Sequence, residues 1–190
     1  MRFEDFKIFK SIPTIKTERL TLRKLKKRDL DDIFEYASDP RVSRYLLWSP
    51  HASRRVSAAY LTRVLSLYKK GQFYDWAIVY SGKMIGICGF SSIDVLADCA
   101  EIGYVINADY WGQGIATEVA RRVMDFGFNR LELQRIEARY IEGNEASASV
   151  MKKCGMSQIK TETRAISEDG EQGVIVTYGI SAEEYFKNNS

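Results

Sequence analysis

The sequence of 190 residues has little of what marks several large classes of protein. It contains three cysteines, and no two of them are spaced as a metal-binding clip. It has one histidine and no apolar run near the ~18 residues that a membrane span needs. Its first ten residues carry acids and bases throughout, unlike a secretory signal peptide. We therefore expect a cytoplasmic protein with reduced cysteines, no metal and no membrane partner.

The composition is that of an ordinary folded domain. Hydrophobic residues make up 45% and aromatic residues 12%, which excludes a largely disordered chain, and the net charge of +3 does not argue for direct nucleic-acid binding. The length suits one domain. We expect a single domain over residues 1–190, with an N-terminal arm (1–16), a core (17–181) and a C-terminal helix and tail (182–190). The oligomeric state stays open, a homodimer included.

Hydrophobic periodicity predicts strands that alternate with helices. A period of two predicts strands at 19–25, 74–80, 84–90, 100–106 and 135–140, and two more on either side of a turn at 168–170. Helical spacing and capping residues predict helices that follow Asp29 and run over 53–70, 115–129, 144–153 and from Ser181, with a loop over 41–52. The hairpins exclude a doubly wound parallel sheet, so the order predicts a mixed α/β sheet.

Residues 101–117, which read EIGYVINADYWGQGIAT, are the most informative segment. A strand runs into a glycine-containing loop, and the loop opens an amphipathic helix. The first N–H groups of a helix lack partners and carry partial positive charge, and glycines such as Gly112 and Gly114 let a phosphate approach them. The N–H groups that we expect to bind a pyrophosphate are those of Gln113, Gly114, Ile115, Ala116 and Thr117.

Three kinds of ligand carry such a pyrophosphate. A nucleoside-triphosphate loop needs a lysine after the second glycine, and none follows Gly114. A dinucleotide fold needs GxGxxG in an early parallel unit, whereas here GQG is followed by Ile-Ala-Thr after a predicted meander. Coenzyme A is the third.

The segment Trp111-Gly112-Gln113-Gly114-Ile115-Ala116 resembles the acetyl-CoA motif of the GNAT superfamily, Arg/Gln-x-x-Gly-x-Gly/Ala, with Trp111 in place of the basic or amide residue. Residues 19–23, 39–42 and 144–156 resemble further segments of its RimJ/RimL branch, in the same order. The resemblance covers about residues 17–180. It implies a GNAT-like α/β domain, whose central mixed, mostly antiparallel sheet has a splay between its two middle strands and is flanked by helices. It also implies acetyl-CoA as co-substrate and a ribosomal or other protein N-terminus as amine acceptor.

The resemblance implies roles for the cofactor site as well. The pantetheine arm would pair, as an added strand does, with the backbone of Tyr104, Val105 and Ile106. Asn144 would bond the pantetheine or the thioester region, cap the following helix, or do both. Ser147 would protonate the departing sulfur, or lie on the helix as a capping partner. Many relatives use a tyrosine as the acid at the position that Met151 holds here.

The reaction requires a neutral amine that attacks the thioester. Deprotonation at pH 7 costs roughly 1.4 kcal/mol for an α-amino group with a pKa of about 8, and about 4.6 kcal/mol for a lysine. Glu101 is the candidate base, with an ion pair to an arginine on the sheet face as the other interpretation. The N–H of Val105 or Ile106 would polarise the carbonyl. A covalent cysteine route is disfavoured because no motif joins a cysteine to His51.

The acceptor side is less defined by the sequence. The aromatic candidates, each of which also suits a hydrophobic core, are Tyr45, Trp48, Trp76 and Phe90. The basic cluster over residues 23–28 suits a ribosome contact or an ordinary solvated surface. Two other functions stay open: a small-molecule N-acetyltransferase for a polyamine, amino sugar or amino acid, and a CoA-binding module without turnover.

Overall fold

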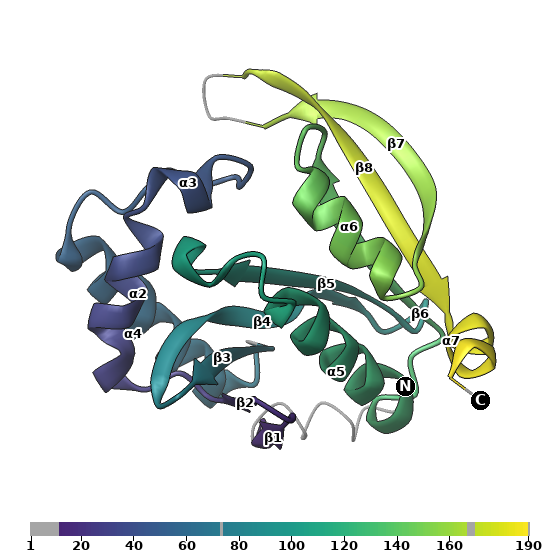
Figure 1. Ribbon diagram of the computed structural model, residues 1–190, viewed down its shortest axis with the longest axis horizontal. Coiled ribbons are helices and arrows are strands. Elements are labelled where there is room, and N and C mark those ends of the chain that lie inside the picture. Colours follow the sequence, from purple (N-terminus) through teal and green to yellow (C-terminus); the bar gives the residue numbers. More distant parts are fainter. Residues whose placement is uncertain (1–11, 73, 167–169, 190) are drawn as a thin grey trace.

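The computed structural model describes residues 12–72, 74–166 and 170–189, and its centre is one sheet of eight strands (Figure 1). The strands follow the spatial order β1-β2-β3-β4-β5-β6-β8-β7. Their bounds are β1 Ile15–Lys16, β2 Leu20–Arg23, β3 Asp75–Tyr80, β4 Lys83–Asp94, β5 Cys99–Ile106, β6 Arg135–Ile141, β7 Ser157–Ala165 and β8 Gln172–Ser181. Among the strands of the described residues, β5 and β6 alone pair in parallel, which confirms the predicted mixed, mostly antiparallel sheet.

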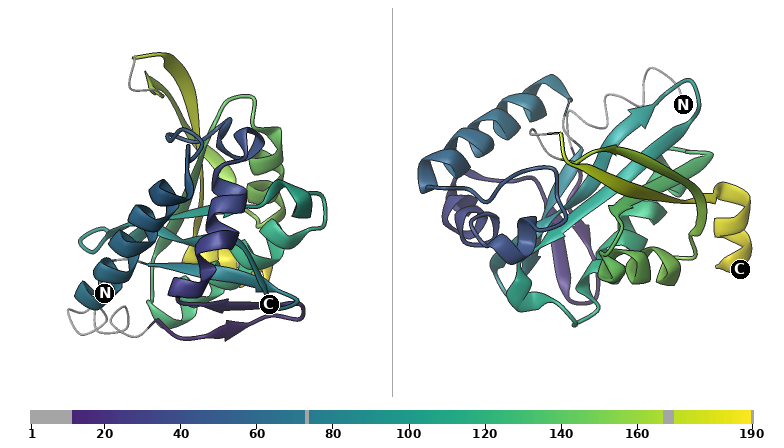
Figure 2. Two further views of the ribbon diagram at one scale, coloured as in Figure 1. Left: turned by 90° about the vertical axis from the view of Figure 1, so that its left-hand side faces the viewer. Right: turned by 90° about the horizontal axis from the view of Figure 1, so that it is seen from above.

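Helices flank this sheet. The longer ones are α2 Leu30–Ala37, α4 Arg54–Lys70, α5 Ile115–Arg130, α6 Glu145–Lys153 and α7 Ala182–Asn188. The short ones are η1 Lys27–Asp29, α3 Pro40–Ser43 and η2 Ala108–Tyr110. Figure 2 shows that α4 and α5 lie on opposite sides of the sheet. Within the described residues, none of these helices has both the length and the apolar character needed to cross a membrane.

Local chemistry explains where the helices begin and end. Gly71 closes α4 in the left-handed conformation (φ 67°), and Ser181 with Glu184 forms the predicted capping box of α7. The expected loop over 41–52 begins instead with α3, because Asp39 accepts a hydrogen bond from the Arg41 N–H and Pro40 suits a first helical turn.

Asp29 precedes α2 as predicted, but its carboxylate does not cap that helix. It accepts two hydrogen bonds from the Arg23 guanidinium, at 2.7 and 2.8 Å, and one from the Lys26 N–H at 2.7 Å. An arginine offers a matching fork of donors, which a capping position does not, so the carboxylate ties β2 to η1.

The hydrophobic core packs α2, α4 and α5 against the sheet. Trp76 of β3 lies edge-on to Phe126 of α5, with ring centroids 5.3 Å apart, and to Phe90 of β4 at 6.4 Å. Trp76 and Phe90 are fully buried, so both belong to the core and not to an acceptor pocket. The expected N-terminal arm is described only from Ile12, which is buried with Ile15; residues 1–11 lie outside the described part of the chain.

Candidate active site

The glycine-containing turn between η2 and α5 has the backbone that an anion site requires. Gly112 (φ 74°) and Gly114 (φ 75°) are both left-handed, which only glycine adopts without strain. Gly114 is the N-cap of α5, and as a glycine it has no side chain to accept a hydrogen bond from the first amides of that helix. A Cβ on Gly112 would meet nothing within 4 Å, so the turn opens into free space. The first N–H groups of α5 are therefore available to a ligand.

The predicted splay begins where β5 leaves β6. The two strands pair only over Cys99–Glu101 and Arg135–Glu137, although β5 continues to Ile106 and β6 to Ile141. A parallel strand that loses its neighbour leaves a row of N–H and C=O groups unpaired on that edge. The splay therefore provides an edge along which an extended arm can pair.

Alternation along β5 shows which groups face the splay. The Asn107 N–H donates to the Ile85 carbonyl of β4, so Val105 also points its backbone groups to β4. Ile106 points the other way, because its carbonyl accepts a hydrogen bond from the Trp111 indole at 2.8 Å. Of the two expected polarising donors, Val105 and Ile106, this pattern favours the N–H of Ile106. Trp111, which replaces the usual basic or amide residue, thereby satisfies the carbonyl of the last residue of β5.

One cavity of about 660 Å³ joins the turn, the splay and α6. Ser147 lines this cavity, and so do all of the residues expected to bind the cofactor except Gln113. These are Tyr104, Val105, Ile106, Trp111, Gly112, Gly114, Ile115, Ala116, Thr117 and Asn144. The opposite wall comes from α3 and the residues after it, Arg41 to Leu46. Gln113 lies within the turn, between the two glycines, but outside the lining of the cavity, and its carbonyl accepts a hydrogen bond from Arg19.

The first turn of α6 presents two of the predicted residues to the cavity. The Asn144 side chain accepts a hydrogen bond from the Ser147 N–H at 3.2 Å, so it caps the helix. Its amide nitrogen keeps its donors for a ligand. The Tyr104 hydroxyl reaches α6 from β5 and donates to the Ser147 carbonyl at 3.3 Å. Burial raises the pKa of Tyr104, which keeps it a phenol at neutral pH. Met151 is buried and does not line the cavity.

Glu101 lies at the last paired residue of β5, where the splay opens, and outside the lining of the cavity. Its carboxylate forms an ion pair with Arg139 of β6, which raises the pKa of that arginine. The Glu101 side chain is 21% exposed, so solvent still reaches it. The structure thus contains the ion pair that the sequence left open as the other interpretation. That pair also fixes the position of the carboxylate at the splay.

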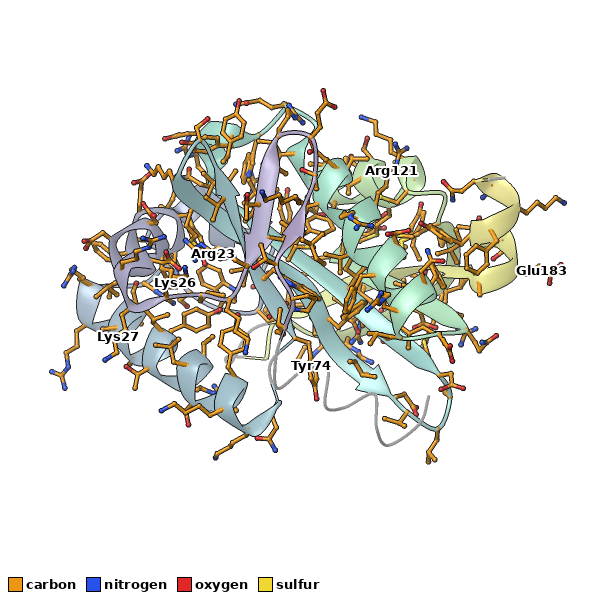
Figure 3. The ribbon with its side chains drawn as sticks, turned by 90° about the horizontal axis from the view of Figure 1, so that it is seen from below. Arg23, Lys26, Lys27, Tyr74, Arg121 and Glu183 are labelled. Atoms are coloured by element: carbon orange, nitrogen blue, oxygen red, sulfur yellow. The ribbon has the colours of Figure 1, made fainter. Side chains whose placement is uncertain are left out.

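A second hollow, of about 620 Å³, adjoins the glycine turn on the outer side of α5. Its basic residues are Arg121, Arg122 and Lys153, and Lys153 also lines the larger cavity. Glu18, Glu118 and Asp125 line the same hollow, and Arg122 forms an ion pair with Asp125. Arg121 and Lys153 are therefore the basic residues beside the glycine turn that could meet a phosphate. Figure 3 shows Arg121 far from Arg23, Lys26 and Lys27 of the basic cluster.

Sequence reasoning missed the residues between β1 and β2 that hold the glycine turn in place. The Arg19 guanidinium donates to the Glu118 carboxylate at 2.8 Å and to the Gln113 carbonyl at 3.1 Å, and the Thr17 hydroxyl donates to Glu118 at 2.5 Å. Burial would raise the pKa of Glu118, but these hydrogen bonds outweigh it and lower the pKa. About a hundred positions separate the partners in sequence, so no local pattern signals the contact.

The cysteines and the histidine lie in unreactive surroundings. Burial raises the pKa of the Cys88 thiol and raises that of Cys154 to about 11, so neither forms a thiolate at neutral pH. Nδ1 of His51 lies 2.8 Å from the Ser57 hydroxyl, and burial lowers the pKa of the imidazole. In the ranges that the structure describes, no three His, Cys, Asp or Glu side chains come together in a way that could hold a metal ion.

Tyr45 is the aromatic candidate that reaches the cavity. It lies against the turn before α6, where its ring is 3.5 Å from the place a Cβ on Gly143 would take. Trp48 packs instead against His51, with ring centroids 5.5 Å apart. Residues of α3 and Tyr45 together form one wall of the cavity, which we call the acceptor wall because it is the surface that we propose faces the amine.

Comparisons with known proteins agree with this geometry. The acetyltransferase (GNAT) domain family matches residues 19–157. "Uncharacterized N-acetyltransferase p20" of Bacillus licheniformis is 36% identical over 140 residues, which cover 73% of this chain and 79% of that protein. "Putative ribosomal N-acetyltransferase YdaF" of Bacillus subtilis is 24% identical over 175 residues, which cover 88% and 94%.

A solved GNAT-family acetyltransferase from Bacillus anthracis superposes with a TM-score of 0.80 at 26% identity, over 90% of this chain and 99% of that one. The structure of the ribosomal L7/L12 α-N-protein acetyltransferase RimL in complex with coenzyme A superposes with a TM-score of 0.78 at 19% identity, over 89% and 98%. The glycine turn, the splay and these matches together show that the chain belongs to the GNAT family of acetyltransferases.

Proposed function

We propose that this enzyme transfers the acetyl group of acetyl-CoA to the α-amino group of a protein or peptide N-terminus. One observation carries the proposal: the left-handed glycine turn at the start of α5 and the unpaired edge of β5 open into the same cavity. The turn suits a pyrophosphate, and the strand edge suits the pantetheine arm, so the two features match the two halves of coenzyme A.

The chain's own residues divide the work of the reaction. The first amides of α5 and the donors around the second hollow bind and orient the phosphates, and the Ile106 N–H lies on the edge where it can polarise the thioester carbonyl. Glu101, at the mouth of the splay, accepts the proton of the amine directly or through a water. The Ser147 hydroxyl, on the first turn of α6, can donate to the departing sulfur, while the Tyr104 hydroxyl of β5 holds that turn in place by donating to the Ser147 carbonyl.

An α-amino acceptor fits the modest basic assistance that the site offers. With a pKa of about 8 such an amine is already partly neutral at pH 7, whereas deprotonation of a lysine at that pH costs roughly 3 kcal/mol more. The resemblance to the RimJ/RimL branch and the name of the relative YdaF support the same acceptor class. Small amines such as polyamines or amino sugars are the second candidate class.

The decisive test is an acceptor panel with acetyl-CoA, read by release of the CoA thiol and by mass spectrometry. The panel contains peptides with a free N-terminus, the same peptides with a blocked N-terminus and a free lysine, a polyamine and an amino sugar. We expect acetylation of the free N-termini alone. If the polyamine or the amino sugar is acetylated and the free N-termini are not, the enzyme is a small-molecule N-acetyltransferase. A calorimetric titration with acetyl-CoA, and with NADH as the contrasting ligand, tests the cofactor separately.

Glu101→Gln tests turnover against a CoA-binding module. We expect kcat to fall by roughly 10²- to 10⁴-fold, the range of general-base catalysis, while the affinity for acetyl-CoA stays unchanged. Glu137→Gln is the matched control, because Glu137 pairs opposite Glu101 in the sheet and forms an ion pair with Arg135. Equal losses in the two variants would remove Glu101 from the proton transfer.

A further inference from the structure

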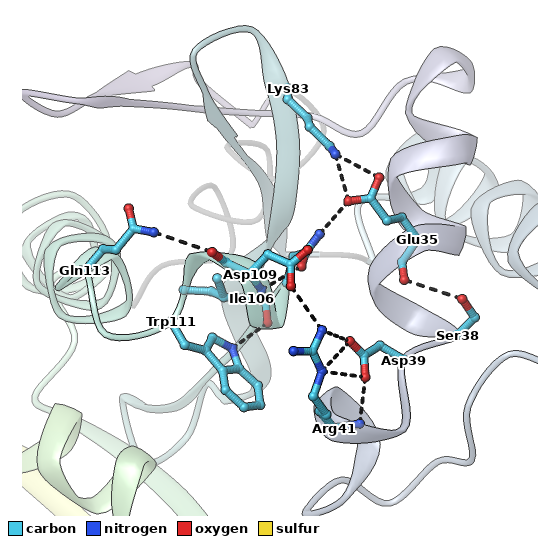
Figure 4. A network of polar contacts seen from close by, with 10 residues as sticks. Glu35, Ser38, Asp39, Arg41, Lys83, Ile106, Asp109, Trp111 and Gln113 are labelled. Atoms are coloured by element: carbon cyan, nitrogen blue, oxygen red, sulfur yellow. Dashed lines mark hydrogen bonds and ion pairs between the residues drawn. The ribbon is translucent and has the colours of Figure 1, made fainter.

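A chain of polar contacts joins the two walls of the cavity (Figure 4). It begins at Lys83, whose ammonium group bonds both carboxylate oxygens of Glu35 at 2.7 and 2.8 Å. Glu35 accepts a further hydrogen bond from the Asn107 side chain at 2.8 Å, and Asn107 accepts one from the Asp109 N–H at 3.0 Å. The chain thus runs from β4 through α2 to the end of β5 and into η2.

The last step of the chain crosses to the acceptor wall. Arg41 of α3 donates to the Asp109 carboxylate at 3.0 Å and to the Asp39 carboxylate at 2.6 Å, so two carboxylates fix the guanidinium. The remaining nitrogen of the guanidinium points toward the indole of Trp111 (Figure 4). Arg41 and Trp111 both line the cavity. The Arg41–Asp109 ion pair is therefore a direct tie between α3 and the segment that leads into the glycine turn.

The two ends of the chain differ in rigidity. Asn107 is 4% exposed and satisfied on both sides of its amide, so it holds η2 firmly against α2. The Arg41 and Asp109 side chains are 60% and 67% exposed, so their tie lies in solvent and salt weakens it. An exposed ion pair contributes little to overall stability. Its effect is therefore on the placement of α3 relative to the coenzyme loop and not on whether the domain folds.

We infer that Arg41 and Asp109 are positioning residues that couple the acceptor wall to the coenzyme loop. A coenzyme bound to the turn at 112–117 restrains η2, and the ion pair passes that restraint to α3, so the wall that faces the acceptor becomes ordered. Coupling of this kind works in both directions, since each ligand alters the affinity for the other by the same factor. The inference rests on the proposed function only in taking acetyl-CoA as the ligand of the turn.

Hydrogen exchange read by mass spectrometry tests the coupling without any acceptor. In the wild-type protein, saturating acetyl-CoA should slow exchange over residues 40–46 at least twofold. In Asp109→Asn and in Arg41→Gln this slowing should be lost, and it should also be lost in the wild type at 1 M NaCl, where the Debye length is about 3 Å. Asp31→Asn is the matched control, because it removes an equally exposed ion pair, Asp31–Arg54 at 2.5 Å, outside the cavity lining.

Kinetics with the best acceptor give the second reading. Each single substitution should lower kcat/KM for the acceptor about two- to fivefold. The double variant should lose no more than Arg41→Gln alone, because that substitution already removes the tie to Asp109 together with the ion pair to Asp39. The calorimetric affinity for acetyl-CoA separates two failures. If acetyl-CoA does not bind, the proposed function fails. If it binds and residues 40–46 respond equally in the wild type and in Asp109→Asn, or if the losses add in the double variant, the coupling is refuted.

Discussion

Gly114→Ala is the substitution that tests the coenzyme site most directly. Gly114 has a φ of 75°, and a Cβ there would meet only the Arg19 guanidinium, at 3.9 Å. The substitution therefore causes no clash in the free protein and imposes only the cost of a left-handed alanine, about 1–2 kcal/mol. Gly82→Ala is the matched control. Gly82 has a φ of 84° and open space around it, and it lies in the β3–β4 turn outside the cavity lining.

The two variants should differ in ligand affinity and not in stability. The added methyl group of Gly114→Ala occupies the space through which a phosphate approaches the first amides of α5. Loss of one hydrogen bond to a charged phosphate costs about 1.5–3 kcal/mol, which is roughly a 10- to 100-fold rise in Kd. Gly82→Ala should leave the Kd unchanged while it destabilises the fold by a similar amount.

Urea denaturation and calorimetric titration with acetyl-CoA measure the two quantities on the same preparations. Similar losses in unfolding free energy, with a raised Kd in Gly114→Ala alone, would confirm the turn as the pyrophosphate seat. A Kd for Gly114→Ala within twofold of the wild type would refute the reasoning, because the ligand would then not approach these amides.

Three further predictions concern named side chains. Asn144→Ala should lower the unfolding free energy by about 1 kcal/mol and weaken acetyl-CoA binding. Asn144→Asp should keep the helix cap and therefore the stability, but not the binding. Equal binding by the wild type and both variants would limit Asn144 to capping. Asp29→Ala should lower the unfolding free energy measured by urea denaturation by about 3–5 kcal/mol. The substitution removes the carboxylate that pairs with Arg23, whose side chain is only 11% exposed. A loss under 1 kcal/mol would contradict this. Burial raises the pKa of Asp75 to about 7 in the folded protein, so the stability that protonation supplies is present at low pH and is lost as pH rises toward 7. Asp75→Asn should remove that pH dependence and raise the unfolding free energy at pH 8 by at most about 4 kcal/mol, and an unchanged pH profile would contradict the burial of this carboxylate.

The prediction of the fold succeeded where the signal is local. Gly71 after a run of helical spacing and Ser181 three residues before Glu184 mark helix ends within one turn of chain, and both ends lie where they were expected. Asp29 shows the limit of such signals. Its position before α2 is typical of a cap, but a guanidinium from β2 offers a stronger partner, and only the packing of β2 against η1 brings it there.

The sequence by itself determined the kind of protein this is. A strand, a turn with Gly112 and Gly114, and an amphipathic helix form one continuous segment, so the proposed anion site depends on neighbouring residues alone and can be predicted without coordinates. The turns and the succession of strands and helices along the chain follow from periodicity of the same short range, and that succession predicted a mixed sheet. The spatial order of the strands is known only from the structure.

Only the tertiary structure decided what surrounds that segment. The pair of Glu101 with Arg139, the brace from Arg19 to Gln113 and the tie from Arg41 to Asp109 join residues 38, 94 and 68 positions apart. No periodicity extends over such distances. Each contact exists because the hydrophobic core packs the helices against the two sides of one sheet, and that packing brings charged groups from separate strands and helices within contact distance.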